Sequence, residues 1–309
     1  MSLSTSELSL AGHVSAGRIS AGRATAGRAV AVVIVTYNSA PVLGMCLDSL
    51  RRQTRSADVV VIVDNNSAEP GYLDQVSSKA PLELIRNGRN DGFCSGNNTG
   101  YGLARTCEYV LFLNPDAFLS ADFLEEALRW MERPENARVG CLTGTLLRFD
   151  VAAAHPTGVI DSTGIFQKWY GKWYDRAQGT LWAPPSGQTR CEDIPAACGA
   201  LMFCRIRALE EIALGTQQVF DQRFFMYKED IDLSLRLRAR GWRIVYRPDL
   251  LCHHGRGWQG RTNMPYRSRY ISARNELRTC WRNNLKGLPY SLLKFMYVAT
   301  FERFMNRFR

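Results

Sequence analysis

The 309-residue chain contains no apolar run that approaches the ~20 residues needed to cross a membrane, and its N-terminus lacks the apolar core of a signal peptide. Its nine cysteines are an odd number and include no Cys-x-x-Cys pair, which argues against a disulfide framework and against a zinc site. Together these absences favour a protein of the reducing cytoplasm.

Two nucleotide-binding motifs are absent as well. No Gly-x-x-x-x-Gly-Lys-Ser/Thr occurs, which argues against a P-loop phosphotransferase. No Gly-x-Gly-x-x-Gly follows the first predicted strand, which disfavours a dinucleotide dehydrogenase.

Acidic residues are scarce in the C-terminal part of the chain. Residues 256–309 hold twelve Lys/Arg and two Asp/Glu, so the whole formal net charge of +10 lies there. A basic tail on a neutral body favours an anionic partner such as lipid, nucleic acid or an anionic substrate, with a merely solvated surface as the alternative. Because the tail has no recognisable helix-turn-helix or zinc module, nucleic acid is not expected.

The N-terminal segment is repetitive. Residues 15–29 are three tandem five-residue units that each contain Ala-Gly-Arg. Repeats this small and glycine-rich cannot bury a core, so residues 1–29 are predicted to form a disordered low-complexity arm.

From residue 30 onward, apolar runs of strand length alternate with helical patterns. Strands are predicted over 30–35, 59–63, 81–85 and 109–113, and helices over 40–52 and 95–106. Because these strands are apolar throughout, the pattern predicts a parallel sheet covered by helices on both faces.

Three of the strands end in polar clusters, which are 36–38 (Thr-Tyr-Asn), 64–66 (Asp-Asn-Asn) and 114–116 (Asn-Pro-Asp). Proline cannot donate to a sheet ladder, so the last of these strands must end there and leave Asp116 at its carboxyl end. That edge is where open α/β sheets bind ligands. The alternative is that Asp116 only forms a turn or caps a helix that begins near Ala121.

The segment over 150–195 is rich in glycine, proline and aromatic residues, among them Trp169 and Trp173. Such a composition is typical of a lid, or of a site where aromatic faces stack on sugar rings or on an apolar carrier. Packing in the core is the alternative.

A second acidic site is predicted at Glu229 and Asp230, which begin a helix that ends at Gly241. Acidic residues at a helix start also complement the helix dipole, which is a purely structural alternative. The aromatic residues directly before the pair favour desolvation, which raises the pKa of a carboxyl group toward that of a useful base.

Half of the four histidines, His253 and His254, follow a predicted strand over 243–246. Neutral imidazole binds ions such as Mn²⁺ or Mg²⁺ when a carboxylate shares the site. A metal site and a structural role are both open for this pair.

A helix is predicted over 289–309, and its apolar stripe consists of Leu293, Tyr297, Phe301, Phe304 and Phe308. Basic residues flank the stripe. The pattern favours either contact with an anionic membrane surface or packing on the catalytic domain or on a second subunit of a homodimer.

Five motifs and a tail element, in this order and spacing, resemble the family 2 glycosyltransferases of the GT-A fold, in particular their bacterial rhamnosyltransferase-like branch. The resemblance spans residues 30–280. The matching segments are 33–38 (Val-Ile-Val-Thr-Tyr-Asn), 64–67 (Asp-Asn-Asn-Ser), 90–100 (Asn-Asp-Gly-Phe-Cys-Ser-Gly-Asn-Asn-Thr-Gly), 113–117 (Leu-Asn-Pro-Asp-Ala), 220–233 and 270–275 (Tyr-Ile-Ser-Ala-Arg-Asn).

The resemblance implies an α/β GT-A fold, with a Rossmann-like and mostly parallel sheet, helices on both faces and a C-terminal helical extension. The implied catalytic domain covers 30–265, with a nucleotide-sugar half over 30–117 and an acceptor half over 118–265. A basic helical extension over 266–309 would follow.

The resemblance also implies roles for individual residues. The implied donor-binding residues are Thr36, Tyr37, Asn38, Asp64, Asn66, Asn97, Asn98, Asn114 and Asp116, with Thr36, Tyr37 and Asp64 at the nucleotide base. Asp116 and His254 would bind Mg²⁺ or Mn²⁺, although Asn114 stands where the family's signature has its first acid.

The implied catalytic base is Asp230, with Glu229 beside it. The small-residue loop of Cys198, Gly199 and Ala200 would shape the acceptor site, to which we also assign Trp169 and Trp173.

The expected activity is inverting, metal-dependent transfer of rhamnose or another hexose from a nucleoside diphosphate donor. A deoxythymidine diphosphate sugar is favoured and a uridine diphosphate sugar is next. The acceptor would be a hydroxyl of a saccharide, a lipid-linked saccharide or a secondary metabolite, in the cytoplasm or at the inner face of the membrane. The alternative is a non-catalytic nucleotide-sugar-binding module of the same fold.

Overall fold

The computed structural model describes residues 29–77, 82–184, 190–255, 264–283 and 285–306. The N-terminal arm predicted over 1–29 lies outside the described residues except for its last residue, and so does Phe308 of the predicted C-terminal stripe.

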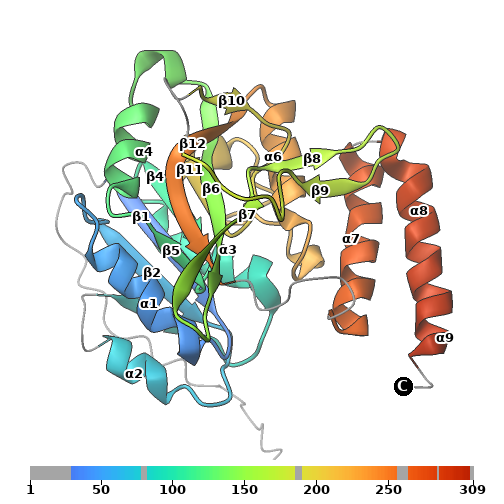
Figure 1. Ribbon diagram of the computed structural model, residues 1–309, viewed down its shortest axis with the longest axis horizontal. Coiled ribbons are helices and arrows are strands. Elements are labelled where there is room, and N and C mark those ends of the chain that lie inside the picture. The colour runs from blue at the N-terminus through green and yellow to red at the C-terminus, as the bar shows by residue number, and fades with distance from the viewer. Residues whose placement is uncertain (1–28, 78–81, 185–189, 256–263, 284, 307–309) are drawn as a thin grey trace, which may run out of the picture.

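Within the described residues, ten strands form one mixed sheet (Figure 1). Its parallel half is built, in spatial order, from β3 (Glu83–Arg86), β2 (Val59–Asp64), β1 (Val30–Thr36) and β4 (Tyr109–Leu113). A helix connects each of these strands to the next one along the chain, as the alternating sequence pattern predicts.

The other half of the sheet mixes directions. The strand β11 (Leu201–Arg205) runs antiparallel between β4 and β6 (Val139–Asp150), and β12 (Arg243–His254) then pairs with β6 in parallel. Three short or edge strands complete it: β5 (Ala117–Leu119) and β10 (Glu192–Asp193) on β12, and β7 (His155–Ser162) on β6. A separate hairpin consists of β8 (Ile165–Gln167) and β9 (Trp173–Asp175).

The core is divided by the alternation of side chains along β1, all of which is buried. Val30, Val32 and Ile34 pack with α1 (Ala40–Arg51) and α4 (Phe123–Met131) on one face of the sheet. Ala31, Val33 and Val35 pack with α3 (Gly92–Ala104) and α6 (Glu229–Ala239) on the other face. A strand buried on both faces reads as a continuous apolar run, which is the pattern of residues 30–35.

The helix α3 lies very close to β1 because two of its glycines face the strand. A Cβ atom at Gly96 would lie 2.7 Å from a methyl carbon of Val35, and one at Gly100 would collide with Val33. The glycines of the 90–100 motif therefore set the distance between this helix and the sheet, which in turn sets the position of Gly92 and Phe93 at the start of the helix.

One predicted strand boundary and one alternative role are wrong. The predicted strand over 243–246 continues as β12 to His254, because the ladder shifts register between Tyr246 and Leu251 and so accommodates Pro248. His253 and His254 therefore lie in the strand and not after it. The alternative role of Asp116 as a helix cap is also wrong, because α4 begins at Phe123 with Asp122 at its N-cap.

The remaining helices are α2 (Gly71–Ser77), α5 (Ile206–Glu210), α7 (Tyr266–Asn283), α8 (Leu288–Tyr297) and α9 (Arg303–Met305), and a π-helical turn over Val298–Glu302 joins the last two. Figure 1 shows α7 and α8 side by side, to one side of the sheet. No helix in the described ranges has the length and apolar character that a bilayer crossing requires.

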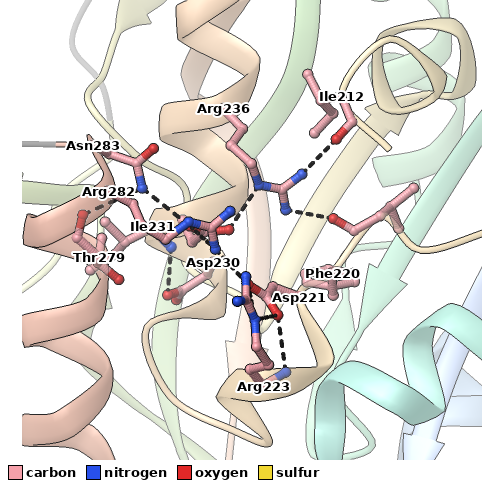
Figure 2. Close-up of polar contacts among 12 residues, drawn as sticks. Ile212, Phe220, Asp221, Arg223, Asp230, Ile231, Arg236, Thr279, Arg282 and Asn283 are labelled. Carbon is pink, nitrogen blue, oxygen red and sulfur yellow. Dashed lines mark hydrogen bonds and ion pairs between the residues drawn. The ribbon is translucent and has the colours of Figure 1, made fainter. Parts of the chain in front are cut away.

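A buried ionic network fastens α6 to α7. The carboxylate of Asp232 has no exposed surface and accepts from Arg236 Nε at 2.8 Å and from Asn283 Nδ2 at 3.1 Å, with Arg282 at 3.5 Å. Arg236 also donates to the carbonyls of Ile212 and Val219, so it ties the segment before α6 to the same point (Figure 2). Because every charge here has a partner, the network is costly to break at one end.

We predict that Asp232→Ala lowers the free energy of unfolding by about 3–5 kcal/mol, because it leaves Arg236 buried without its counter-charge. The matched control is Asp48→Ala, which removes an exposed pair with Arg51 at 2.6 Å and should cost no more than about 1 kcal/mol. Urea unfolding at neutral pH measures both. Equal losses in the two variants would contradict the network's role.

Candidate active site

Two cavities at the carboxyl ends of the parallel strands form one cleft. Their volumes are about 730 Å³ and 450 Å³, and both are lined by Phe93, Asn114, Asp116 and Met226. The strands β1 and β4 end at this cleft, as expected for a ligand site of an open α/β sheet.

The residues after β1 line the larger cavity, where the resemblance places the nucleotide. Tyr37 exposes half of its surface, whereas Thr36 is buried and shares a hydrogen bond with Tyr72 at 2.9 Å. Asn38 has a left-handed backbone (φ 54°) that is held by two bonds, from its N–H to Ser67 Oγ at 2.8 Å and from the Ala68 N–H to its side-chain oxygen at 2.9 Å. Ser67 and Ala68, which follow β2, thus fix this wall of the larger cavity.

Four predicted donor residues that the structure describes are not among those lining either cavity: Asp64, Asn66, Asn97 and Asn98. The carboxylate of Asp64 is buried and accepts from the N–H and hydroxyl of Ser67 at 3.1 and 2.6 Å. Its contact with a nucleotide base stays a prediction.

The two asparagines of α3 hold the cleft wall. Asn97 donates to the Phe93 carbonyl at 3.0 Å, and Asn98 bonds both the N–H and the carbonyl of Phe220 at 2.9 and 2.8 Å. Their amides therefore position the two phenylalanines, whose rings meet edge to face at 5.9 Å.

Asp116 and His254 meet at the junction of the two cavities. The tight turn after β4 is closed by the Ala117 N–H on the Asn114 carbonyl at 3.1 Å, and Ala117 then pairs with His254 in the β5–β12 ladder. This pairing brings His254 Nε2 to 3.5 Å from Asp116 Oδ1. The turn role proposed for Asp116 is confirmed, and the same turn positions its carboxylate.

A second acid that contacts His254, Asp161, was not predicted. It lies fully buried in β7, and its Oδ2 is 2.8 Å from His254 Nδ1, so it orients the imidazole with Nε2 toward Asp116. It is one of five acidic residues in the segment over 150–195, and nothing in the sequence distinguishes it from the other four.

Asp116, Asp161 and His254 alter one another's pKa values. Burial opposes ionisation of Asp116, but the charge and hydrogen bond of His254 outweigh it and hold the pKa of Asp116 below its ordinary value. Burial likewise acts to lower the pKa of His254, yet Asp116 and Asp161 raise it to about 9. Asp116 is therefore ionised at neutral pH.

These residues fit a divalent cation. The side-chain oxygen of Asn114 is buried without a hydrogen-bond partner among the described residues, and it lines both cavities beside Asp116. A carboxylate, an amide oxygen and, once a bound cation has displaced its proton, an imidazole nitrogen form a donor set that suits Mg²⁺ or Mn²⁺. The described ranges contain no group of three or more His, Cys, Asp or Glu arranged for a metal, so the protein's own donor set is small.

The loop before α6 is strained, and one amide holds it. Phe225, Tyr227 and Lys228 have φ values of 62°, 69° and 70°, in the left-handed region that is costly for residues with side chains. The Nδ2 of Asn275, buried in α7, donates to the carbonyls of Phe224, Met226 and Tyr227 at 2.7, 2.9 and 3.0 Å. Asn275 closes the 270–275 motif, which was the sequence signal for it.

This loop places Glu229 and Asp230 on the smaller cavity, in the first turn of α6. Asp230 accepts from the Gly199 N–H at 3.0 Å and from the Ile231 N–H at 2.8 Å, the second of which is drawn in Figure 2. Glu229 Oε2 is buried without a hydrogen-bond partner among the described residues. Burial and then the charge of Asp230 raise the pKa of Glu229 to about 8. Burial also raises the pKa of Asp230, although Lys228 and the two N–H groups oppose the rise. The predicted desolvation is confirmed.

The predicted acceptor residues divide into two groups. Cys198, Gly199 and Ala200 line the smaller cavity, whereas Trp173 is buried elsewhere and Trp169 is 92% exposed in the turn of the β8–β9 hairpin. The structure adds Asp175, Tyr227 and Lys228 to this cavity, and it adds Arg267, Ser268 and Ile271 of α7 to the larger one. Arg267 belongs to the basic tail, which was its sequence signal.

Comparison with known sequences finds consistent relatives. A family model described as Glycosyl transferase family 2 matches residues 31–212. The chain is 28% identical over 279 residues to an N-acetylglucosaminyl-diphospho-decaprenol L-rhamnosyltransferase of Mycobacterium tuberculosis, which covers 82% of this chain and 87% of that protein. It is 27% identical to the O-antigen biosynthesis protein RfbC of Myxococcus xanthus, over 72% of this chain and 17% of that protein.

Solved structures share the fold. GalNAc-T7 with UDP, GalNAc and Mn²⁺ aligns with a TM-score of 0.63 at 16% identity, over 82% of this chain and 47% of that one. The mannosyltransferase PcManGT from Pyrobaculum calidifontis with GDP-Man and Mn²⁺ aligns with a TM-score of 0.55 at 20% identity, over 89% and 71%. These likenesses concern the fold alone, and they confirm the predicted GT-A architecture.

The raised pKa of Glu229 predicts how stability depends on pH. Between its ordinary value of 4.5 and about 8, the folded chain keeps a proton that the unfolded chain has lost, so the free energy of unfolding falls as pH rises through this window. In Glu229→Gln that fall should be smaller, and the variant should be more stable than the wild type at pH 8. Thermal melts across the window, with the exposed Glu108→Gln as control, measure the slope. An unchanged slope in Glu229→Gln would count against the shift.

Proposed function

The chain belongs to glycosyl transferase family 2, and we propose that it transfers a sugar from a nucleoside diphosphate donor to an acceptor hydroxyl with inversion at the anomeric carbon. The proposal rests chiefly on one feature of the smaller cavity. Asp116, which His254 keeps ionised, and Asp230, whose pKa is raised, line the same space although they come from distant parts of the chain.

These two carboxylates suit the two demands of glycosyl transfer. A group that stays ionised helps to hold the donor's diphosphate end through a cation, while a group with a raised pKa accepts a proton near neutral pH. A carboxylate with a low pKa is a poor proton acceptor, and one with a raised pKa is a poor cation ligand, so the two tasks call for two different groups.

Asp230 takes the proton of the acceptor hydroxyl as that oxygen attacks C1 of the donor sugar. The bond between C1 and the diphosphate oxygen breaks, and the electron pair leaves with the diphosphate. Attack on the face opposite to the leaving group inverts the anomeric configuration. The N–H groups of Gly199 and Ile231 hold the carboxylate of Asp230 in one orientation for this step.

Asp116, the amide oxygen of Asn114 and Nε2 of His254 would hold Mg²⁺ or Mn²⁺, which when bound supplies charge neutralisation for the departing diphosphate. Asp161 keeps His254 turned toward this point. Because Asn114 contributes no charge, this set would supply the cation with one negative charge only, that of Asp116.

For the donor we propose a deoxythymidine diphosphate sugar, with a uridine diphosphate sugar next, and rhamnose or another hexose as the transferred group. The name of the mycobacterial relative supports rhamnose, and its diphospho-decaprenol acceptor supports a lipid-linked saccharide over the other acceptor classes. The GalNAc-T7 and PcManGT complexes, which hold Mn²⁺, support a metal-dependent reaction.

Replacement of the proposed base, Asp230, tests whether the transfer rate falls while donor binding is kept. We expect Asp230→Asn to lower the transfer rate by at least about 100-fold, because the amide cannot accept the proton. Donor binding, measured by calorimetry, should stay near the wild-type value. The control is Asp122→Asn, an exposed N-cap residue without a side-chain cap bond. Near-normal turnover in Asp230→Asn would remove the base assignment.

Replacement of Asp116 tests the metal site. In the wild type, stabilisation by a panel of sugar nucleotides in thermal-shift measurements should increase with added Mn²⁺ or Mg²⁺, and the preferred nucleotide should give the largest shift. Asp116→Ala should lose this dependence on the metal, whereas Asn114→Asp should reach saturation at a lower metal concentration. A metal titration that Asp116→Ala leaves unchanged would exclude Asp116 as a ligand.

A further inference from the structure

The C-terminal helices carry large apolar side chains on an exposed face. In Figure 1, α8 and α9 lie on the far side of α7 from the sheet. Among the described residues after α7, the exposed large apolar side chains are those of Leu285, Leu292, Leu293, Met296, Tyr297, Phe301, Phe304 and Met305, and Leu293 is 67% exposed. We call this set the arm surface. The four described residues of the predicted stripe, Leu293, Tyr297, Phe301 and Phe304, are thus each more than half exposed and are not buried against the catalytic domain.

An apolar groove adjoins the arm surface. It measures about 500 Å³ between α7 and α8, and its apolar lining includes Leu277, Trp281 and Phe295. Arg274 and Arg278 border it, and both donate to the Arg223 carbonyl. A groove with an apolar interior and guanidinium groups at its edge suits an anionic amphiphile, whose chain would enter the groove and whose charge would meet the arginines.

The positive charge of these helices is not neutralised from within. Their two acidic residues are already bound inside the helical pair, Glu276 by Lys294 and Glu302 by Arg269. Across the described part of the chain, Arg267, Arg274, Arg278, Lys286 and Arg303 have no acidic side chain as a salt-bridge partner. Burial and the neighbouring arginines Arg274, Arg223 and Arg282 lower the pKa of Arg278, as expected where like charges gather.

We propose that the arm surface docks on an anionic lipid bilayer, with the basic side chains at lipid phosphates and the apolar side chains in the interfacial region. A second copy of the chain fits less well, because residues 256–309 carry all of the +10 net charge and two arm surfaces would repel each other. Nucleic acid would meet the charges but would leave the apolar side chains uncovered. An anionic bilayer satisfies both.

Docking in this manner places the cleft at the membrane. Arg267, Ser268 and Ile271 of α7 line the larger cavity, and α7 also packs against α8. The cleft is thus one helix away from the arm surface. Docking itself requires neither donor nor metal, so it is measured separately from transfer.

Co-sedimentation of the full chain with vesicles tests the proposal. The wild type should pellet with vesicles that contain phosphatidylglycerol at low salt, and far less with pure phosphatidylcholine or at high salt. Lys286→Gln with Arg303→Gln should weaken binding by about fivefold for each charge removed. Leu293→Asp with Met296→Asp should weaken it by at least about tenfold.

Matched variants control for general effects of charge and polarity. Arg129→Gln with Arg207→Gln removes two exposed charges elsewhere, and Leu181→Asp alters a side chain that is 81% exposed outside the arm. Both should pellet like the wild type, and so should Asp230→Asn, which keeps the outcome independent of the proposed catalysis. Wild-type pelleting by the Leu293→Asp, Met296→Asp variant would overturn the proposal. So would conversion of a dimer to a monomer by this variant in light scattering, with unchanged vesicle binding.

Discussion

The carboxamide of Asn275 is the contact on which the candidate site depends most. Its Nδ2 meets three carbonyls of a loop in which Phe225, Tyr227 and Lys228 all have left-handed backbones. Such a conformation persists only where its surroundings impose it. Because Glu229 and Asp230 follow this loop directly, the position of the acid pair is decided by a residue of α7. The buried network around Asp232 holds that helix against α6 and so keeps the clamp in place.

The two acidic groups of the cleft lie in opposite electrostatic environments. His254 outweighs burial at Asp116 and lowers the pKa of that carboxyl, whereas burial and mutual repulsion raise the pKa of Glu229. The difference arises from backbone placement. Asp116 directly precedes Ala117, which pairs with His254 in the strand ladder, whereas the hydrogen bonds that Asp230 accepts from the described residues come from neutral N–H groups. One carboxylate is therefore suited to hold a cation and the other to accept a proton.

Much of the fold could be predicted because its signals are local. Continuous apolar runs mark buried strands, and Pro115 marks the strand end that presents Asp116. The contacts that were missed join residues far apart in sequence, such as Asp161 with His254 and Asn275 with the loop before α6. Neither short-range periodicity nor residue type reveals such a pairing. The same limit applies to Asn98, whose amide holds backbone groups of the distant Phe220, a contact that its motif does not indicate.

The segment from β7 to the β8–β9 hairpin contacts both the catalytic cleft and the C-terminal helices. At one end Asp161 orients His254, and at the other Tyr170 packs on Tyr290 while a side chain at Gly171 would collide with the backbone of Gly287. A short, hydrogen-bonded stretch of chain thus connects the imidazole of the cleft to the start of α8. Tightly packed elements transmit displacement and do not absorb it. One continuous stretch of chain, from Asp161 to Gly171, therefore supports both the imidazole of His254 and the start of the C-terminal helical pair.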